Sequence, residues 1–382
     1  MSAEIIDLTI EPFLPEDIKQ HWIPLDGQSV PHLFQFARYP PQNMVYQEYH
    51  SFSQLLHEEG VTSFDPYTLL QHGPPSSNLS EKYKTAIKAA SSPTLSFTLV
   101  SLTGNAVRFP VWVLDYWKVI RVPMEYRCSW KKVLVWLRDI SQSDSMVGIC
   151  EQVMAGLLCF PWNESSCTVH DMELLLTTSS LSDFHIDSTL TTIFRYHDHT
   201  GAGISDHHTP LLYANLKSII NAYEKLQTGL MGIKGRTLLQ VENRIVLGQI
   251  ESVAGVVSLP GHWTSIVFSF KPPKILYGDS LGAPLSPKRA LSFRRWMCHM
   301  LLRAGTQMPV NDISIYPLPT GVQQDSISCG LFALNSIGRH YFPQGFPPLQ
   351  HGDLSLPRYR LELALDLLQK GAVSHILYIT VF

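Results

Sequence analysis

The residues with the clearest chemical potential lie in the stretch QQDSISCGLFALNSIGRHYF, residues 323 to 342, where Cys329 separates a polar segment from an apolar one. The apolar run has the pattern of a helix, so the cysteine is expected at a helix N-terminus. The dipole and N–H groups of that end lower the pKa of a thiol and favour the nucleophilic thiolate. Gly330 is expected to allow a tight turn and a close approach of substrate.

A thiol nucleophile needs a general base, which a third group must orient. His262 opens the strand-like segment HWTSIVF, and Asp279 follows the next such segment, KILYG. The turn at residues 271–274 lies between them, nearly equidistant from both. Antiparallel pairing of the two strands therefore predicts that His262 and Asp279 meet at one edge of a sheet.

The set also includes a candidate donor for a developing oxyanion. The side-chain amide of Gln323 or Gln324 could act there beside the backbone N–H of Cys329. A lone cysteine that opens a helix is more often a small hydrophobic packing residue, and Cys298 in WMCHMLL is interpreted in that way. The order and spacing of His, Asp, Gln and Cys favour a catalytic site at Cys329.

A His-Trp pair, an Asp seventeen residues after the His, and a Gln six residues before a Cys-Gly pair form one pattern. This pattern resembles that of the ubiquitin-like-protein proteases, the SUMO- and NEDD8-type deconjugating cysteine proteases, a family that is similar to adenovirus protease. LSDFHIDSTL, residues 181 to 190, also resembles the Leu-x-Asp-x-x-Ile segment that opens their catalytic domain. The resemblance covers residues 165–382 and implies an α+β, papain-like fold with a mixed sheet flanked by helices.

The activity that the resemblance implies is hydrolysis of peptide or isopeptide bonds after the C-terminal glycine of a ubiquitin-like modifier. It implies that Cys329 is the nucleophile, His262 the general base and acid, Asp279 its orienting partner and Gln323 the oxyanion donor. No cofactor and no metal are expected. The expected partner is a ubiquitin-like modifier or its conjugates.

Two further residues receive substrate-binding roles from the resemblance. Trp263 would lie over the narrow channel that admits a Gly-Gly tail, and Asp183 would contact the modifier or order the entrance. Ser180 stands where SUMO-cleaving members usually carry a Trp, which affects selectivity for that tail. Residues 325–328, Asp-Ser-Ile-Ser, replace the common Asn-Gly-x-Asp before the cysteine.

The elements around these residues follow from caps and hydrophobic periodicity. Ser182 is expected to cap a helix, and a second helix is expected from Thr209 and Pro210 to Gly229. The remaining expectations are strands at 253–259, 264–270, 274–280 and 312–318, helices at 286–305, 329–340 and 359–371, and a terminal strand at 375–382. Strands interspersed with helices predict a mixed α and β domain.

The chain is expected to divide into an N-terminal region, 1–164, of unknown function, and a catalytic domain, 165–382. Turn-prone clusters such as ARYPPQNM indicate a loop-rich start, which is followed by mixed helix and strand segments. Trp130, Leu134 and Leu137 fall at helical spacing within this region. Core packing is the favoured interpretation of its aromatic residues, and a partner-binding face is the alternative.

Composition restricts the class of protein. Charged residues are 16% of the chain and the net charge is -3, which gives no electrostatic case for nucleic acid or an anionic membrane. The six cysteines show no CxxC pair, and the acidic N-terminus lacks the features of a signal peptide. An intracellular protein, nuclear or cytoplasmic, is therefore expected.

Three alternatives remain open at the level of sequence. The cluster His197, Asp198, His199, Asp206, His207 and His208 has metal-ligand residue types but fits no zinc spacing, so a solvated loop is favoured. Bacterial effector acetyltransferases use a similar order of His, acid and Cys with acetyl-coenzyme A; Trp263 and the Gln before the cysteine favour the protease. A modifier-binding module with weak turnover is the third alternative.

Overall fold

The computed structural model describes residues 46–47, 52–61, 64–65, 68–159, 169–199, 207–224, 235–352 and 354–379. The chain divides into two compact units, residues 1–135 with 158–163 and residues 136–157 with 164–382. The helix α5 (Val113–Ile140) begins in the first unit, and α6 (Asp144–Cys159) follows it in the sequence.

The first unit contains an antiparallel sheet whose strands follow the order β1-β2-β3. Phe97 and Phe109 face each other across β2 and β3 and are fully buried, as is Trp117 of α5, whose ring centroid lies 5.0 Å from that of Phe109. Burial of these aromatic side chains supplies the core of the unit. The elements are η2 (Ser53–Leu55), β1 (Leu56–His57), α3 (Thr68–Gln71), α4 (Ser77–Ala89), β2 (Ser96–Val100) and β3 (Ala106–Pro110).

The second unit contains a mixed five-stranded sheet in the order β4-β5-β6-β7-β8. The central strands β5 to β7 pair antiparallel, and the edge strands β4 and β8 pair parallel to β5 and β7. The α+β class with a mixed sheet flanked by helices is confirmed. The strands are β4 (His208–Pro210), β5 (Ser252–Leu259), β6 (His262–Phe270), β7 (Pro273–Gly278) and β8 (Ile315–Pro317).

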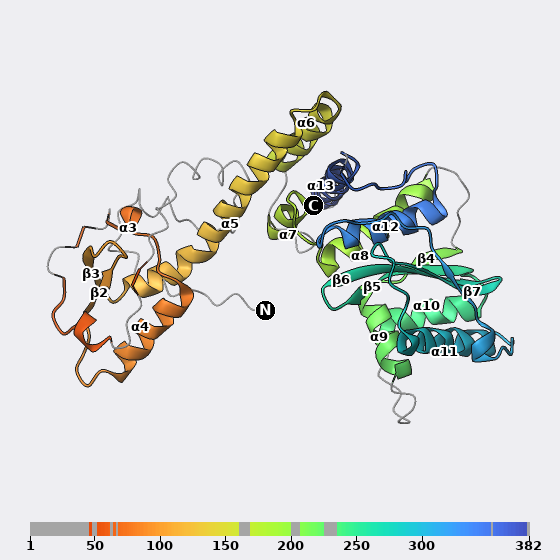
Figure 1. Cartoon of the computed structure of the whole chain (residues 1–382), viewed down its shortest axis with the longest axis horizontal. Coiled ribbons are helices and arrows are strands. Elements are labelled where there is room, and N and C mark those ends of the chain that lie inside the picture. The colour runs from red at the N-terminus through yellow and green to blue at the C-terminus, as the bar shows by residue number, and fades with distance from the viewer. Residues whose placement is uncertain are drawn as a thin grey trace. The chain divides into compact units, whose positions relative to one another are not determined.

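Helices cover both faces of this sheet (Figure 1). On one face, Trp296 of α11 packs edge-on against Phe268 of β6, in a core that α9 and α10 complete. On the other, the Ser336 hydroxyl of α12 donates to that of Ser265 of β6 at 2.7 Å. The helices are α7 (Val169–Leu175), α8 (Asp183–His199), α9 (Tyr213–Glu224), α10 (Arg236–Val246), α11 (Pro287–Arg303), η4 (Val310–Asp312), α12 (Cys329–Tyr341) and α13 (Ser355–Ile379).

The predicted helix start at Thr209 and Pro210 is wrong, because both residues lie in β4. Pro210 has no N–H to donate and is tolerated there because β4 is an edge strand. The helix α9 begins three residues later, and the Asp187 carboxylate of α8 accepts a hydrogen bond from the Tyr213 N–H at 2.8 Å. This N-terminus is thus capped from another helix; Gly229 lies outside the described residues.

The predicted terminal strand is also wrong over residues 375–379, which continue α13; residues 380–382 lie outside the described part. The helix begins with Pro357 in its first turn, where a missing N–H is tolerated.

Both edge strands of the sheet carry a proline, Pro210 in β4 and Pro317 in β8, which interrupts the N–H row that a further strand would need.

Candidate active site

The β6–β7 hairpin brings His262 and Asp279 together. Its register pairs Phe270 with Pro273 at the turn and Ser265 with Gly278 at the open end. The two strands therefore place His262 and Asp279 at the same end of the hairpin. His262 Nε2 lies 2.9 Å from Asp279 Oδ1. The His262 side chain is 12% exposed and that of Asp279 is 2% exposed. A carboxylate buried to this extent needs hydrogen-bond or ionic partners.

Two more donors hold the Asp279 carboxylate. The Leu281 N–H donates to Oδ1 at 2.8 Å, and the Tyr277 hydroxyl donates to Oδ2 at 3.4 Å. With Nε2 facing a carboxylate, the neutral imidazole carries its proton there and leaves Nδ1 as the basic nitrogen. The structure thus brings Asp279 into hydrogen-bonding contact with His262, and the role of orienting acid stays a prediction.

Cys329 is the first residue of α12, as predicted, and is a free thiol that exposes 2% of its surface. The backbone N–H of Trp263 acts as a donor toward the thiol and lowers its pKa, which places the thiol beside the peptide that joins His262 to Trp263. The loop before α12 and the start of β6 therefore bring the Cys329 thiol to the backbone that follows His262.

Electrostatics at the thiol differ from the sequence-based expectation. Burial raises the pKa of Cys329, and the N–H groups of Trp263, Gly330 and Cys329 itself lower it without offsetting that effect. The helix N-terminus does favour the thiolate, but desolvation disfavours any charge and is the larger effect here. Burial therefore favours the neutral thiol over the thiolate at this position.

Gly330 has a packing role that the sequence does not reveal. A Cβ at this position would lie 3.2 Å from Ile186 Cδ1 and from Leu181 Cβ, at the start of α8. The absent side chain thus lets the N-terminus of α12 approach α8 closely. The expected tight turn is not what requires glycine here, because its φ is not positive.

Gln323 is buried at 5% exposure, whereas Gln324 is exposed. Its Oε1 accepts a 2.5 Å hydrogen bond from the Ser280 hydroxyl, and its Nε2 donates to the Asp325 carbonyl at 2.6 Å. The side chain is thus fixed between the residue after Asp279 and the turn before Cys329. The amide carries a second N–H besides the one that the Asp325 carbonyl accepts.

Trp263 connects the hairpin to the segment that opens α8. Its Nε1–H donates to the Leu181 carbonyl at 3.0 Å, and its ring packs edge-on against Tyr213 with centroids 5.7 Å apart. Asp183 is exposed, and its carboxylate accepts from the Phe184 N–H at 3.1 Å. The structure thus places Trp263 beside Cys329 and leaves Asp183 on the surface of α8.

Several residues of this site were missed by sequence reasoning. Ser280 and Asp325 lie next to predicted residues but have no distinctive type, so only their hydrogen bonds reveal them. Arg360 of α13 is buried at 4% exposure and donates to the carbonyls of Leu174 and Ser179. A lone arginine inside an amphipathic helix gives no sequence signal of this kind.

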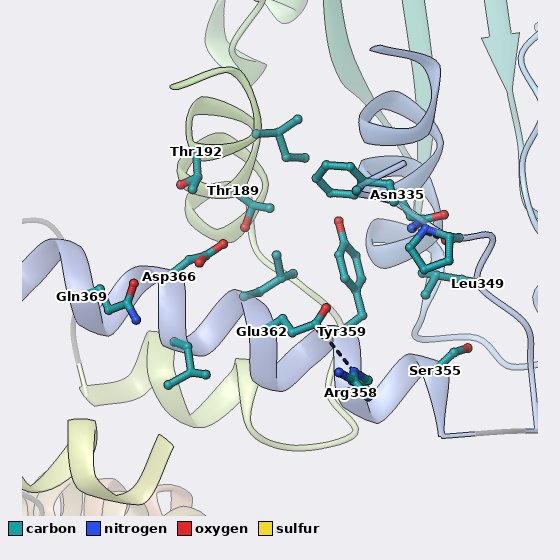
Figure 2. Close-up of a pocket in the computed structure, with 16 residues that line it drawn as sticks. Thr189, Thr192, Asn335, Leu349, Ser355, Arg358, Tyr359, Glu362, Asp366 and Gln369 are labelled. Carbon is teal, nitrogen blue, oxygen red and sulfur yellow. Dashed lines mark hydrogen bonds and ion pairs between the residues drawn. The ribbon is translucent and has the colours of Figure 1, made fainter. Parts of the chain in front are cut away.

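A cavity of about 680 Å³ lies between α8, α12 and α13, away from the predicted catalytic side chains (Figure 2). Thr189, Asn335 and Tyr359 line it, and the Tyr359 hydroxyl points into it. A second cavity of about 540 Å³ reaches Asp279 and is lined by residues 282–285 and 315–320. This second cavity reaches the Asp279 member of the His262–Asp279 pair.

The histidine-rich segment forms no metal site among the described residues. In the part of the chain that the structure describes, no group of three or more His, Cys, Asp or Glu side chains is placed to hold a metal ion. His208 instead bonds to the Ser252 hydroxyl at 2.8 Å, and His207 to the Gln249 carbonyl at 3.2 Å. Asp206 lies outside the described residues.

Among the described helices, none is long and apolar enough to cross a membrane.

No protein-family model and no curated relative matches the sequence. Among solved structures, the chain is similar to a de-SUMOylating protease, at 14% identity and a TM-score of 0.41, over 56% of this chain and 90% of that one. It is also similar to the Ulp1-like SUMO protease catalytic domain of Chaetomium thermophilum, at 17% identity and a TM-score of 0.42, over 53% and 78% of the two chains.

A third similar structure is the C-terminal Ulp1 protease domain in complex with Smt3, the yeast ortholog of SUMO. It is 15% identical, with a TM-score of 0.40, and the match covers 58% of this chain and 94% of that one. These proteins are of the class that the sequence pattern resembles. At such identities and TM-scores, the activity of this chain has to be argued from its own side chains.

Proposed function

We propose that the second unit is a cysteine protease that hydrolyses peptide or isopeptide bonds after the C-terminal glycine of a ubiquitin-like modifier. The observation that carries the proposal is the His262–Asp279 pair at 2.9 Å, with the peptide after His262 within hydrogen-bonding reach of the Cys329 sulfur. A thiol, a base and an orienting carboxylate at one sheet edge are the parts that acyl transfer through a thioester requires.

The first chemical step follows from the neutral state of the thiol. His262 Nδ1 accepts the proton of Cys329 as the sulfur attacks the carbonyl carbon of the terminal glycine. Asp279 stabilises the imidazolium through Nε2, 2.9 Å away. Because burial raises the pKa of the thiol, the proton moves during the attack and no resting ion pair is required.

The tetrahedral intermediate places negative charge on the former carbonyl oxygen. The Gln323 amide and the Cys329 N–H are the donors proposed to stabilise it, and one such donor is worth about 3 kcal/mol of barrier. The imidazolium of His262 then gives its proton to the leaving amine, which leaves a thioester on Cys329. A water molecule, deprotonated by His262, hydrolyses the thioester and restores the thiol.

A slender acyl group suits the access to the nucleophile. Cys329 exposes 2% of its surface, the backbone N–H of Trp263 acts as a donor toward its thiol, and the Trp263 ring is fixed by a hydrogen bond to the Leu181 carbonyl. A glycine tail carries no side chains to clash with a tryptophan, so a ubiquitin-like C-terminus fits this approach. The exposed Ser180 leaves that side of the approach without the tryptophan wall expected for SUMO-cleaving members.

The direct test is hydrolysis of SUMO, NEDD8 and ubiquitin that carry a fluorogenic amide on the terminal glycine. We expect release of the fluorophore from one of them, and no release by Cys329→Ser or His262→Ala protein that is folded. Hydrolysis that persists in both variants, or none by the parent, contradicts the proposal. Labelled acetyl-coenzyme A, added in parallel, would acylate Cys329 if the chain were an acyltransferase.

A further inference from the structure

One carboxylate organises the turn that leads into Cys329. Asp325 Oδ1 accepts from the N–H groups of Ile327 at 3.0 Å and of Ser328 at 2.8 Å. Its Oδ2 accepts from the Ser328 hydroxyl at 2.7 Å. Ser328 precedes α12 but makes no side-chain cap of its own, so Asp325 satisfies the donors at this entrance.

The main chain of the same residue holds the proposed oxyanion donor. The Asp325 carbonyl accepts the 2.6 Å hydrogen bond from Gln323 Nε2. Gln323 in turn is bonded to Ser280 twice, through the side chains at 2.5 Å and from its N–H to the Ser280 carbonyl at 3.0 Å. A continuous chain of hydrogen bonds therefore runs from the residue after Asp279 to the residue before Cys329.

Two basic side chains, His351 and Arg360, interact electrostatically with the Asp325 carboxylate. His351 Nε2 lies 3.4 Å from Oδ2, with both side chains about one quarter exposed. Arg360 is buried, and burial lowers its pKa to about 10 while the charge of Asp325 opposes that shift. Since the carbonyls of Leu174, Leu175 and Ser179 accept from Arg360, this cation also fixes the segment that leads to Leu181.

We propose that Asp325 is a positioning residue of the active site: its carboxylate holds the turn that presents Cys329, and its carbonyl holds the amide of Gln323 at that same turn. The role deepens the proposed protease function and rests on it. It also gives a reason for the departure at this point of the sequence, where Asp325 and Ser328 stand in place of the Asn and Asp of the common Asn-Gly-x-Asp segment.

The position of Asp325 near Cys329 also affects the pKa of the thiol. The charge of Asp325 contributes to raising the pKa of Cys329, after burial, and so opposes the thiolate. Asp325 itself stays ionised: burial acts to raise its pKa, but the hydrogen bonds from Ser328 and Ile327 and the charge of His351 hold it below its usual range. By holding the turn, the Asp325 carboxylate favours the reaction of Cys329, whereas its negative charge raises the pKa of the thiol and disfavours it. Because the two effects are opposed, an experiment can separate them.

Three variants of the full chain make the separation. Asp325→Asn keeps an oxygen for the two N–H donors and removes the charge; Asp325→Ala removes both. Asp312→Asn is the matched control, because Asp312 is an exposed acid of the same unit, near Cys298, and loses the same charge. Folding of each variant is checked by thermal unfolding.

The readout that needs no modifier is the rate of iodoacetamide alkylation at Cys329, followed by mass spectrometry of its peptide against pH. We expect Asp325→Asn to move the midpoint of the curve to lower pH and to keep the plateau of the parent. Asp325→Ala should change the plateau at least twofold, because the turn is no longer held. Asp312→Asn should change neither.

The second readout is steady-state hydrolysis of the modifier amide that the parent protein cleaves. We expect Asp325→Asn to retain kcat within about threefold and Asp325→Ala to lose about tenfold or more in kcat, with little change in KM. Equal kcat and equal alkylation curves for parent, Asp325→Asn and Asp325→Ala would overturn the positioning role. If no modifier is cleaved, the protease proposal fails, and the alkylation plateau still decides whether Asp325 holds the turn.

Discussion

His262 Nε2 and Asp279 Oδ1 lie 2.9 Å apart at the open end of the β6–β7 hairpin, and the Asp279 side chain is 2% exposed. The pair fixes which imidazole nitrogen is free to accept a proton. The pair therefore bears directly on the proposed proton transfer from Cys329.

The loss of kcat on substitution of Asp279 should depend on whether the new side chain can still accept a hydrogen bond from His262. An amide oxygen can still accept from Nε2–H, so Asp279→Asn should lose about tenfold in kcat, whereas Asp279→Ala should lose on the order of a hundredfold or more. Steady-state kinetics on the cleaved modifier, with circular dichroism to verify folding, measures both. Equal losses in the two variants would show that orientation of His262 is not what Asp279 provides.

Gln323→Ala should lower kcat by roughly a hundredfold, which is about 3 kcal/mol of transition-state stabilisation, and leave modifier binding intact. Ser280→Ala is the control, because it removes the hydroxyl that donates to Gln323 Oε1 at 2.5 Å but keeps the amide donor. We expect a smaller kinetic loss for Ser280→Ala. Weaker modifier binding by Gln323→Ala with unchanged kcat would assign Gln323 to binding instead of the oxyanion.

Gly278 is predicted to be essential for the placement of Asp279. A Cβ there would meet Thr320 Oγ1, would lie 2.6 Å from Ser265 Oγ, and would lie 2.9 Å from the Leu318 carbonyl. Gly278→Ala should therefore destabilise the protein by about 1 to 3 kcal/mol and reduce activity. Denaturant unfolding measures the first effect and modifier hydrolysis the second.

The matched control for that glycine is Gly148 in α6, where a Cβ meets nothing within 4 Å. Gly148→Ala should stabilise the helix by about 0.5 to 1 kcal/mol, because alanine is the better helix former, and leave hydrolysis unchanged. A Gly278→Ala protein as stable and active as the Gly148→Ala protein would contradict the close packing at the end of β7.

The pH dependence of thiol reactivity follows from the raised pKa of Cys329. Since burial favours the neutral thiol, the stabilisation from burying it is complete below the ordinary cysteine pKa, about 8.5, and is lost as pH rises through the folded value. Alkylation of Cys329 in the native protein should therefore accelerate at higher pH than in urea-unfolded protein. A native midpoint below the unfolded one would instead indicate a preformed thiolate.

Much of the second unit could be predicted from the sequence, because its signals are local. Ser286 stands at the N-cap of α11 and Pro287 is its first residue, as expected, and the turn between β6 and β7 gave the pairing of two strands and hence the approach of His262 to Asp279. The start of α12 at Cys329 was likewise predicted from the change from polar to apolar residues.

The errors arose where tertiary contacts override local signals. Thr209 and Pro210 have the types of a helix start, but parallel pairing with β5 places them in β4, and Asp187 caps α9 from another helix. The raised pKa of Cys329 depends on burial among α8 and β6, which spacing does not report. The hydrogen bond from Ser280 to Gln323 spans 43 residues along the chain, and that from Arg360 to the Leu174 carbonyl spans 186.

The central claim is that Cys329 is a nucleophile toward the C-terminal glycine of a ubiquitin-like modifier. The most direct measurement mixes the folded protein, and its Cys329→Ala variant, with a panel of modifiers that carry a cysteine-trapping group at that glycine. Mass spectrometry should find a covalent adduct on Cys329 with one modifier and none with the variant. No adduct with any modifier, or an adduct that persists in Cys329→Ala, would contradict the account.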